Sequence, residues 1–213
     1  MTFDEITQHI LACQLCPLAS TRTHAVPGEG SQYAEVLFIG EGPGEKEDLQ
    51  GRPFCGASGK FLDEMLLSIN LKREDVYITN VVKCRPPGNR DPLPEEIDTC
   101  TKHYLFKQIE LINPKVVCFL GRYSMGLFMK GMKISQVHGK AFQKDGRFYI
   151  ALYHPAVALY NGGMRQELLR DFTVVDKILK GKFIEKVKTQ VEVKKEELPS
   201  IRKSRTKQIT LDI

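Results

Sequence analysis

Long apolar runs are absent from this 213-residue sequence. No segment approaches the ~20 consecutive apolar residues that a membrane-spanning helix requires. The opening segment, MTFDEITQHILACQLC, carries acids early and lacks the basic region that begins a secretory signal. We therefore expect a protein that works in the cytoplasm without membrane association.

An excess of one charge sign is also absent from most of the chain. Residues 1–179 contain 21 Lys/Arg and 21 Asp/Glu, so the net charge of +5 comes from residues 180–213, with ten basic and five acidic side chains. Apolar periodicity also stops at about residue 182. The sequence predicts one domain over 1–182 and a basic tail over 183–213. That tail is either a solvated end or a contact for a polyanion.

Short apolar strands alternate with helices along the domain. Strands are predicted over 36–40, 76–82 and 116–121, and a hairpin around Asp145-Gly146 over 141–152 supplies the last strand. Helices are predicted from a capping box at Thr2 to about residue 13, over 61–69, from residue 94 to 112, after residue 121 and over 164–179. This order is typical of an α/β fold whose mainly parallel sheet is covered on both faces and binds ligands at the carboxyl ends of its strands.

The stretch GEGPGEKEDLQGRPFCG, residues 40–56, follows the first predicted strand but matches neither phosphate-binding template. Its G-x-G-x-G spacing differs from that of a dinucleotide fold, and a Walker loop ending at Lys60 would need glycine where Phe54 stands. Four carboxylates in this stretch would also repel a phosphate. The glycines instead favour a close approach of backbone to a flat, uncharged ligand, with Phe54 as a stacking residue.

Four of the six cysteines form a candidate metal site. Cys13-x2-Cys16 ends the first predicted helix, Cys84 follows the second strand, and Cys100 lies in the helix that starts at residue 94. Four thiolates from three segments suit zinc or an iron–sulfur cluster. The alternative is four unrelated buried cysteines. Cys55 and Cys118 are not expected to bind the metal.

Four motifs resemble those of family 4 uracil-DNA glycosylases: GEGPGEKED (40–48), GRPFCG (51–56), ITNVVKCRPPGNRDP (78–92) and YHPAVALYN (153–161). The resemblance covers residues 1–180. It implies a three-layer α/β/α domain around a central four-stranded parallel sheet, and hydrolysis of the N-glycosidic bond of deoxyuridine in DNA. It also implies a [4Fe–4S] cluster, structural in role, on Cys13, Cys16, Cys84 and Cys100.

An enzyme of this kind must extrude the base into a pocket that stacks it and reads its edge. Phe54 is the expected stacking residue, beside backbone at Gly40 and Gly42. Asn80 offers one donor and one acceptor, which fit uracil O4 and N3–H and mismatch cytosine. His154 is expected to donate to uracil O2 and to stabilise the anion of the leaving base.

The reaction also needs a carboxylate to hold water and a group to exclude thymine. Glu41 is the candidate for the water. Glu47 is expected to fill the space beside uracil C5, and Asp48 is the reserve for either role. The alternative for the acids at 45–48 is a solvated first helical turn.

Contacts to DNA are expected on both sides of the pocket. Leu159, Tyr160 and Arg165 lie where the wider superfamily inserts a residue into the gap left by the flipped base. Arg85 and Arg90 are candidates for backbone phosphates, and Arg85 has an alternative role beside the cluster. In the tail, Gln208-x-x-Leu211 resembles the start of a sliding-clamp-binding peptide, although a chance match is the alternative.

The predicted function is therefore a DNA repair glycosylase, active as a monomer on single- or double-stranded DNA in the nucleoid. Two other functions compete with it. One is a non-catalytic iron–sulfur protein of the same fold that binds uracil in DNA, and the other is a zinc-containing nucleotide-binding module.

Overall fold

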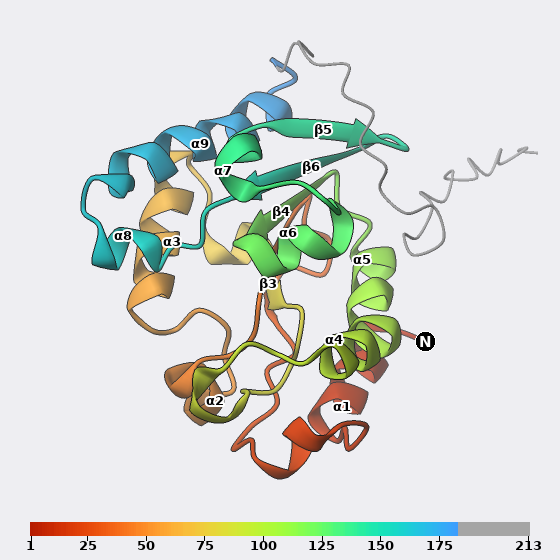
Figure 1. Ribbon diagram of the computed structural model, residues 1–213. Helices are drawn as coiled ribbons and strands as arrows, with labels where there is room; N and C mark the ends of the chain where they lie inside the picture. Colours follow the sequence, from red (N-terminus) through yellow and green to blue (C-terminus); the bar gives the residue numbers. More distant parts are fainter. Residues whose placement is uncertain (183–213) are drawn as a thin grey trace, which may run out of the picture.

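A six-stranded sheet forms the centre of the computed structural model, which describes residues 1–182 (Figure 1). Its order is β1-β3-β2-β4-β6-β5. The strands are β1 (Glu29–Gly30), β2 (Val36–Gly40), β3 (Tyr77–Asn80), β4 (Val116–Leu120), β5 (Ala141–Lys144) and β6 (Arg147–Leu152). The predicted four parallel strands are confirmed as the centre, β3-β2-β4-β6.

Two antiparallel edge strands extend the predicted four-stranded sheet to six. β5 belongs to the predicted hairpin, whose turn residues Asp145 and Gly146 both have positive φ, as a type I′ turn requires. β1 lies in a segment that is predicted to be loop because it contains Pro27, Gly28 and Gly30. It forms through its pairing with β3.

The helices cover both faces of this sheet. They are α1 (Phe3–Leu11), α2 (Glu45–Gln50), α3 (Ala57–Ser68), α4 (Pro94–Cys100), α5 (Phe106–Ile112), α6 (Arg122–Phe128), α7 (Ile134–Val137), α8 (Val157–Tyr160) and α9 (Met164–Leu179). Short 3-10 turns are η1 (Pro17–Ser20), η2 (Arg73–Asp75) and η3 (Pro87–Asn89). The predicted capping box of Thr2 with Glu5 begins α1.

One predicted helix is interrupted. The segment 94–112 consists of α4, a π-helical turn η4 (Thr101–Leu105) and α5. The π turn begins directly after Cys100. Single π turns within α-helices occur often at functional sites, and this one sits at a candidate metal ligand.

Alternate strand residues separate two cores. Leu37 and Ile39 of β2 face one core, which includes residues of α1, α5 and α6. Val36 and Phe38 face the other, which α3 and α9 cover. In Figure 1, α3 and α9 accordingly lie away from α1, α4 and α5. The result is the predicted three-layer α/β/α arrangement.

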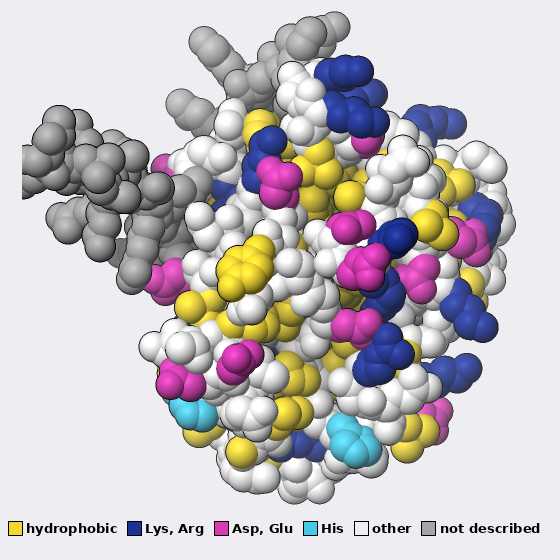
Figure 2. All heavy atoms as spheres, turned by 180° about the vertical axis from the view of Figure 1, so that it is seen from behind, with side chains coloured by type: hydrophobic (Ala, Val, Ile, Leu, Met, Phe, Trp, Pro, Cys, Tyr) yellow, Lys and Arg dark blue, Asp and Glu magenta, His cyan; other side chains and the backbone are white. Residues whose placement is uncertain are grey.

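No helix within residues 1–182 is long and apolar enough to cross a membrane. The face turned away in Figure 1 carries basic and acidic side chains interspersed (Figure 2), in keeping with the balanced charge of the domain. Gln208 and Leu211 of the expected clamp peptide lie outside the described residues.

Candidate active site

The carboxyl ends of the parallel strands bring the predicted residues together. Gly40 at the end of β2 pairs with Asn80 at the end of β3, and Leu120 of β4 pairs with Leu152 of β6. His154 follows β6 by two residues. The loops after these four strands therefore share one edge of the sheet, as the fold predicts.

Phe54 faces His154 across this edge. Their ring centroids lie 5.5 Å apart with an interplanar angle of 28°. A Cβ on Gly40 would lie 2.7 Å from the Phe54 ring and would overlap the amide oxygen of Asn80. Glycine at position 40 therefore keeps open the space where Phe54, Asn80 and the backbone meet.

The turn that carries Phe54 has a strained backbone and is stabilised by hydrogen bonds from Arg73. Phe54 has a φ of 50°, a left-handed conformation that costs a non-glycine residue of order 1–3 kcal/mol. Arg73 donates to the carbonyl oxygens of Pro53 at 2.6 Å and of Phe54 at 3.2 Å. The absence of a side chain at Gly59 lets the Phe54 carbonyl rest on α3, since a Cβ there would overlap it.

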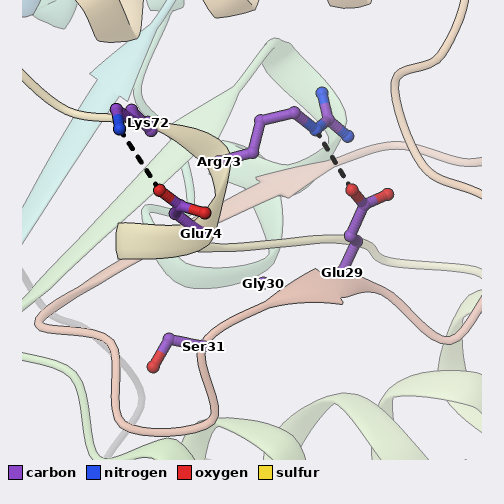
Figure 3. Close-up of a pocket in the computed structure, with 6 residues that line it drawn as sticks. All are labelled: Glu29, Gly30, Ser31, Lys72, Arg73 and Glu74. Atoms are coloured by element: carbon purple, nitrogen blue, oxygen red, sulfur yellow. Dashed lines mark hydrogen bonds and ion pairs between the residues drawn. The ribbon is translucent and has the colours of Figure 1, made fainter.

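Arg73 is fixed by two carboxylates. It pairs with Asp63 at 3.0 Å and, through Nε, with Glu29 at 3.5 Å, and Figure 3 shows the Glu29 and Arg73 side chains pointing toward each other. The two residues also line a groove of about 620 Å³. That groove lies by β1 and η2, at the amino end of β3, so it is remote from Asn80. The sequence analysis missed Arg73, because no local pattern links it to a turn twenty residues earlier.

Asn80 carries an unmet hydrogen-bonding capacity. Its side chain is 1% exposed, and its Oδ1 has no hydrogen-bond partner within the described part of the chain. A buried, unsatisfied polar atom costs roughly 1–3 kcal/mol. Asn80 Oδ1 lies at a strand end beside an open space. It is therefore suited to accept a hydrogen bond from an N–H group of a ligand.

His154 is held as a neutral donor. The backbone N–H of Ala156 donates to its Nδ1 at 3.1 Å, so the ring proton of the neutral form resides on Nε2. Burial lowers the pKa of His154 to about 4, and the nearby Glu47 charge only partly opposes this. The ring is therefore uncharged at neutral pH and presents an N–H.

Glu41 is half-buried beside the same strand ends. Burial raises the pKa of its carboxyl, the charge of Asp91 raises it further, and Arg122 opposes them. Asp91 accepts a hydrogen bond from Tyr123 and pairs with Arg122 at 3.6 Å. This rim, Asp91 with Arg122 and Tyr123, joins the loop after β3 to the start of α6 and was not predicted.

The two other acids have structural partners. Oε1 of Glu47 accepts from the backbone N–H groups of Cys55 at 3.0 Å and Gly56 at 2.9 Å, which fixes the loop after Phe54. Asp48 is buried, and its carboxylate accepts from the N–H groups of residues 23 and 24. These bonds occupy the Asp48 carboxylate and favour a structural role over the reserve role predicted for it.

The four predicted cysteines pack against the same hydrophobic core. Burial raises the pKa of Cys100 to about 12, with Lys83 opposing and Cys84 and Cys16 adding to the rise. Burial likewise raises the pKa of Cys16, to which the charge of Cys13 adds. Each of the four cysteines thus lies within reach of the charge of at least one other.

The surroundings of these sulfurs suit thiolates rather than thiols. Arg22 donates through Nη1 to the Cys84 sulfur at 3.0 Å and through Nη2 to the Cys13 carbonyl at 2.8 Å. Lys83 lies beside Cys84 and Cys100. Arg22 donates directly to the Cys84 sulfur, and a charged donor of this kind stabilises a metal-bound thiolate more than a neutral thiol.

Within residues 1–182, no three His, Cys, Asp or Glu side chains converge as ligands of one metal ion. The donor type, four thiolates, suits zinc as well as an iron–sulfur cluster.

The predicted DNA contacts differ in their availability. Tyr160 in α8 is 90% exposed, and Leu159 is 48% exposed. Arg165 pairs with Glu64 and lies over the ring of Phe61 at 4.5 Å. These contacts leave the exposed apolar pair of α8 as the most available part of this segment.

The two arginines of the loop after β3 are partly engaged. Arg90 forms a bidentate pair with the buried Glu96, at 2.7 and 2.9 Å. Arg85 donates to Asn89 at 2.8 Å. Arg90 therefore anchors the loop to α4, a role that the sequence pattern did not reveal.

Comparison with known proteins identifies the class that this fold and site define. The model of the uracil DNA glycosylase superfamily matches residues 27–174, and the chain belongs to this superfamily. A solved structure, the wild-type SMUG2 of Pedobacter heparinus, aligns with a TM-score of 0.47 and 16% identity over 70% of this chain and 76% of that one.

Sequence relatives narrow the assignment. The chain is 47% identical to the type-4 uracil-DNA glycosylase of Archaeoglobus fulgidus, over 83% of this chain and 93% of the relative. It is 45% identical to that of Sulfurisphaera tokodaii, over 80% and 82%. Within the superfamily these identities place it with the type-4 enzymes, which confirms the family predicted from the four motifs.

Proposed function

We propose that this chain excises uracil from DNA by hydrolysing the bond between uracil N1 and deoxyribose C1′, which leaves an abasic site. The observation that carries the assignment of the pocket is the unpartnered Oδ1 of Asn80, buried beside Phe54 and His154. In this pocket Phe54 stacks on the extruded base, a contact worth roughly 1–3 kcal/mol.

Asn80 reads the edge of the base. Its Oδ1 accepts from uracil N3–H, and its Nδ2 donates to O4. Cytosine presents an acceptor at N3 and a donor at position 4. Oδ1 would then face another acceptor and Nδ2 another donor, in a buried site. Such mismatches can reject an analogue strongly, because the polar groups of the site lose their partners.

His154 and Glu41 act on opposite sides of the breaking bond. As the C1′–N1 bond breaks, its electron pair passes to uracil, and Nε2–H of the neutral His154 donates to O2 of the resulting anion. Glu41 accepts a proton from a water molecule, whose oxygen bonds to C1′. Uracil leaves with a proton taken up from solvent.

Glu47 forms one wall of the pocket. Its carboxylate is held by two backbone N–H groups next to Phe54, so it cannot swing away to admit a methyl group. We therefore assign to Glu47 the exclusion of thymine at C5.

Cys13, Cys16, Cys84 and Cys100 are proposed to hold a [4Fe–4S] cluster. The support is the donor set, four cysteines that pack on one core, with Arg22 bonded to the Cys84 sulfur and Lys83 next to Cys84 in the chain. When bound, the cluster crosslinks the start of the chain to the loop after β3 and to α4. Iron and sulfide assays with a visible spectrum of anaerobically purified protein test this, and a colourless, zinc-containing protein would contradict it.

The cellular setting is also proposed. We infer a monomer in the cytoplasm, where reducing conditions keep cysteines available to iron. All six cysteines are free thiols, which supports this setting.

The decisive experiment is excision from oligonucleotides. Single- and double-stranded DNA with one uracil is incubated with the protein, then assayed for free uracil and for strand scission after alkali. We expect both products from wild-type protein, and at least about 100-fold slower formation of each with Glu41→Gln. Absence of both from wild-type protein would refute the proposal. Asn80→Asp should gain measurable action on cytosine if Asn80 reads the edge.

A further inference from the structure

Lys83 is a buried cation between the candidate active site and the cysteine cluster. It follows β3, precedes Cys84 and is 1% exposed. Its Nζ donates to the hydroxyl of Thr79 at 2.6 Å and to the backbone carbonyl of Asn80 at 2.7 Å. The Lys83 side chain therefore folds back on β3 and bonds to the end of the strand that carries Asn80.

The hydrogen-bond partners of Lys83 do not balance its charge. Both acceptors, a hydroxyl and a carbonyl, are neutral oxygens. A buried ammonium needs a negative partner, because the desolvation of an unpaired charge is costly. The ionisable groups beside Lys83 are Cys84, its neighbour in the chain, and Cys100. Thiolates bound to a cluster would supply the missing negative charge.

The backbone of Lys83 faces the cysteines and the neighbouring loop. Its carbonyl accepts from Val26 N–H at 2.7 Å, and the next residue in the chain is Cys84. The adjacent Pro27 carbonyl accepts from Thr79 at 2.8 Å. One residue thus adjoins a cluster ligand in the chain and contacts the loop at 26–27 and the end of β3.

We propose that Lys83 is a positioning residue that couples the cysteine cluster to Asn80. The inference rests on the proposed cluster. It adds that the cluster helps to orient the Asn80 side chain through Lys83. Removal of the ammonium frees the Asn80 carbonyl and the strand end, so the pocket reads uracil less well even when the cluster is present.

The test is a double-mutant cycle of Lys83→Met with Asn80→Ala, followed by single-turnover excision and by inhibition with free uracil. Iron content is measured for every variant, and rates are expressed per iron-loaded molecule. We expect Lys83→Met to lower the loaded rate by about 10- to 100-fold, as is typical of residues that orient ligands, and to weaken inhibition by uracil. In the Asn80→Ala background the effect should fall to about twofold, within the range of independent sites.

Arg147→Met is the matched control. Arg147 is also buried, at 2% exposed, and donates to a backbone carbonyl, that of Pro114 at 2.9 Å. It lies at the amino end of β6, away from the cluster and the site. We expect lower stability from Arg147→Met, with unchanged iron content and loaded rate.

Two results would overturn the proposal. One is iron loss in Lys83→Met with an unchanged rate per loaded molecule, which would make Lys83 a support for the cluster alone. The other is an equal effect of Lys83→Met with and without Asn80. Should Lys83→Met not fold, Thr79→Val is used in its place. This substitution removes the hydroxyl that accepts from Lys83 Nζ, and its effect on the rate is measured with and without Asn80→Ala. Wild-type protein without iron would refute the cluster, while the cycle would still test the link to Asn80.

Discussion

At the scale of single residues, the site depends on groups whose state is set by their neighbours. A backbone N–H fixes the tautomer of His154, and burial keeps its ring neutral. Asn80 retains an unpaired acceptor. Glu41 has a raised pKa in a half-buried position. Each of these features prepares a side chain for the ligand before the ligand arrives.

The pH dependence of excision should report Glu41. A base acts in its ionised form, and a raised pKa means that Glu41 keeps its proton to a higher pH. The acid limb of kcat/KM should therefore lie above the ordinary glutamate value of about 4.3. We expect Glu41→Gln to abolish this limb and to lower kcat by roughly 10²- to 10⁴-fold.

Glu45→Gln is the control for that measurement, because Glu45 is exposed on α2 in the same loop. It should retain the rate and the acid limb. An acid limb that persists unchanged in Glu41→Gln would assign the base to another group.

Arg73 should affect the reaction without touching the base. Arg73→Gln removes the donors that hold the carbonyls of Pro53 and Phe54, so the stacking ring loses its fixed position. Misplacement of a positioning group by about 1 Å can cost 10²-fold. We expect kcat/KM to fall by up to about 100-fold and inhibition by free uracil to weaken.

Arg52→Gln provides the comparison for Arg73. Arg52 pairs with the same Glu29 at 2.7 Å, but its side chain is largely exposed and is not bonded to the Phe54 turn. Its substitution should leave kcat/KM within about twofold, as for an independent site. An equal fall of kcat/KM in the two variants would show that the ion pair with Glu29, rather than the support of the Phe54 turn, affects the reaction.

At the scale of elements, the site is a set of strand ends supported by helices beneath their loops. The start of α3 lies under the Phe54 turn, and α4 with its π turn carries Cys100. The hydrogen bonds of β3 extend past its end, since Val81 and Val82 donate to the carbonyls of Gly40 and Glu41. The loops that carry function are therefore anchored to regular structure.

Because α3 packs closely against the Phe54 turn, we expect a methyl group added at Gly59 to destabilise the protein. A Cβ in Gly59→Ala would overlap the backbone carbonyl of Phe54, which cannot rotate away as a side chain would. Overpacking of this kind costs typically 1–3 kcal/mol, so we expect the free energy of unfolding to fall by about that amount. Excision should also slow, because the turn must shift.

Gly126→Ala in α6 is the matched substitution. It also replaces a helical glycine, but nothing lies within 4 Å of the added Cβ. Helix propensity then favours alanine by roughly 0.5–1 kcal/mol. Urea denaturation of the two variants should give shifts of opposite sign, and a stabilised Gly59→Ala would contradict the packing.

At the scale of the whole molecule, charge is distributed unevenly along the chain. The domain is neutral and mixes both signs on the face shown in Figure 2, whereas the basic excess lies in residues 180–213. The glycosylase site therefore does not depend on a strongly basic domain. The tail carries the net positive charge, and its contact with a polyanion stays a prediction.

The tail also carries the expected clamp peptide. We propose that Gln208 and Leu211 contact a sliding clamp, on the basis of their spacing alone. Deletion of residues 206–213 should weaken binding to the cognate clamp, measured by calorimetry, and should leave excision from short oligonucleotides unchanged. Gln208→Ala with Leu211→Ala in the full chain keeps the tail charge as a control. Equal clamp affinity in all three proteins would refute this contact.

The sequence alone determined the order of strands and helices, the hairpin, the family and the residues that gather at the strand ends. These are local signals: apolar periodicity, turn residues and contiguous motifs such as GRPFCG. The tertiary structure alone decided which of the polar groups are free. It committed Asp48 to the 23–24 loop and Arg90 to Glu96, and it brought Arg73 and Lys83 to the site. Local periodicity cannot specify such partners, because hydrogen bonds between distant segments depend on how the packed elements meet.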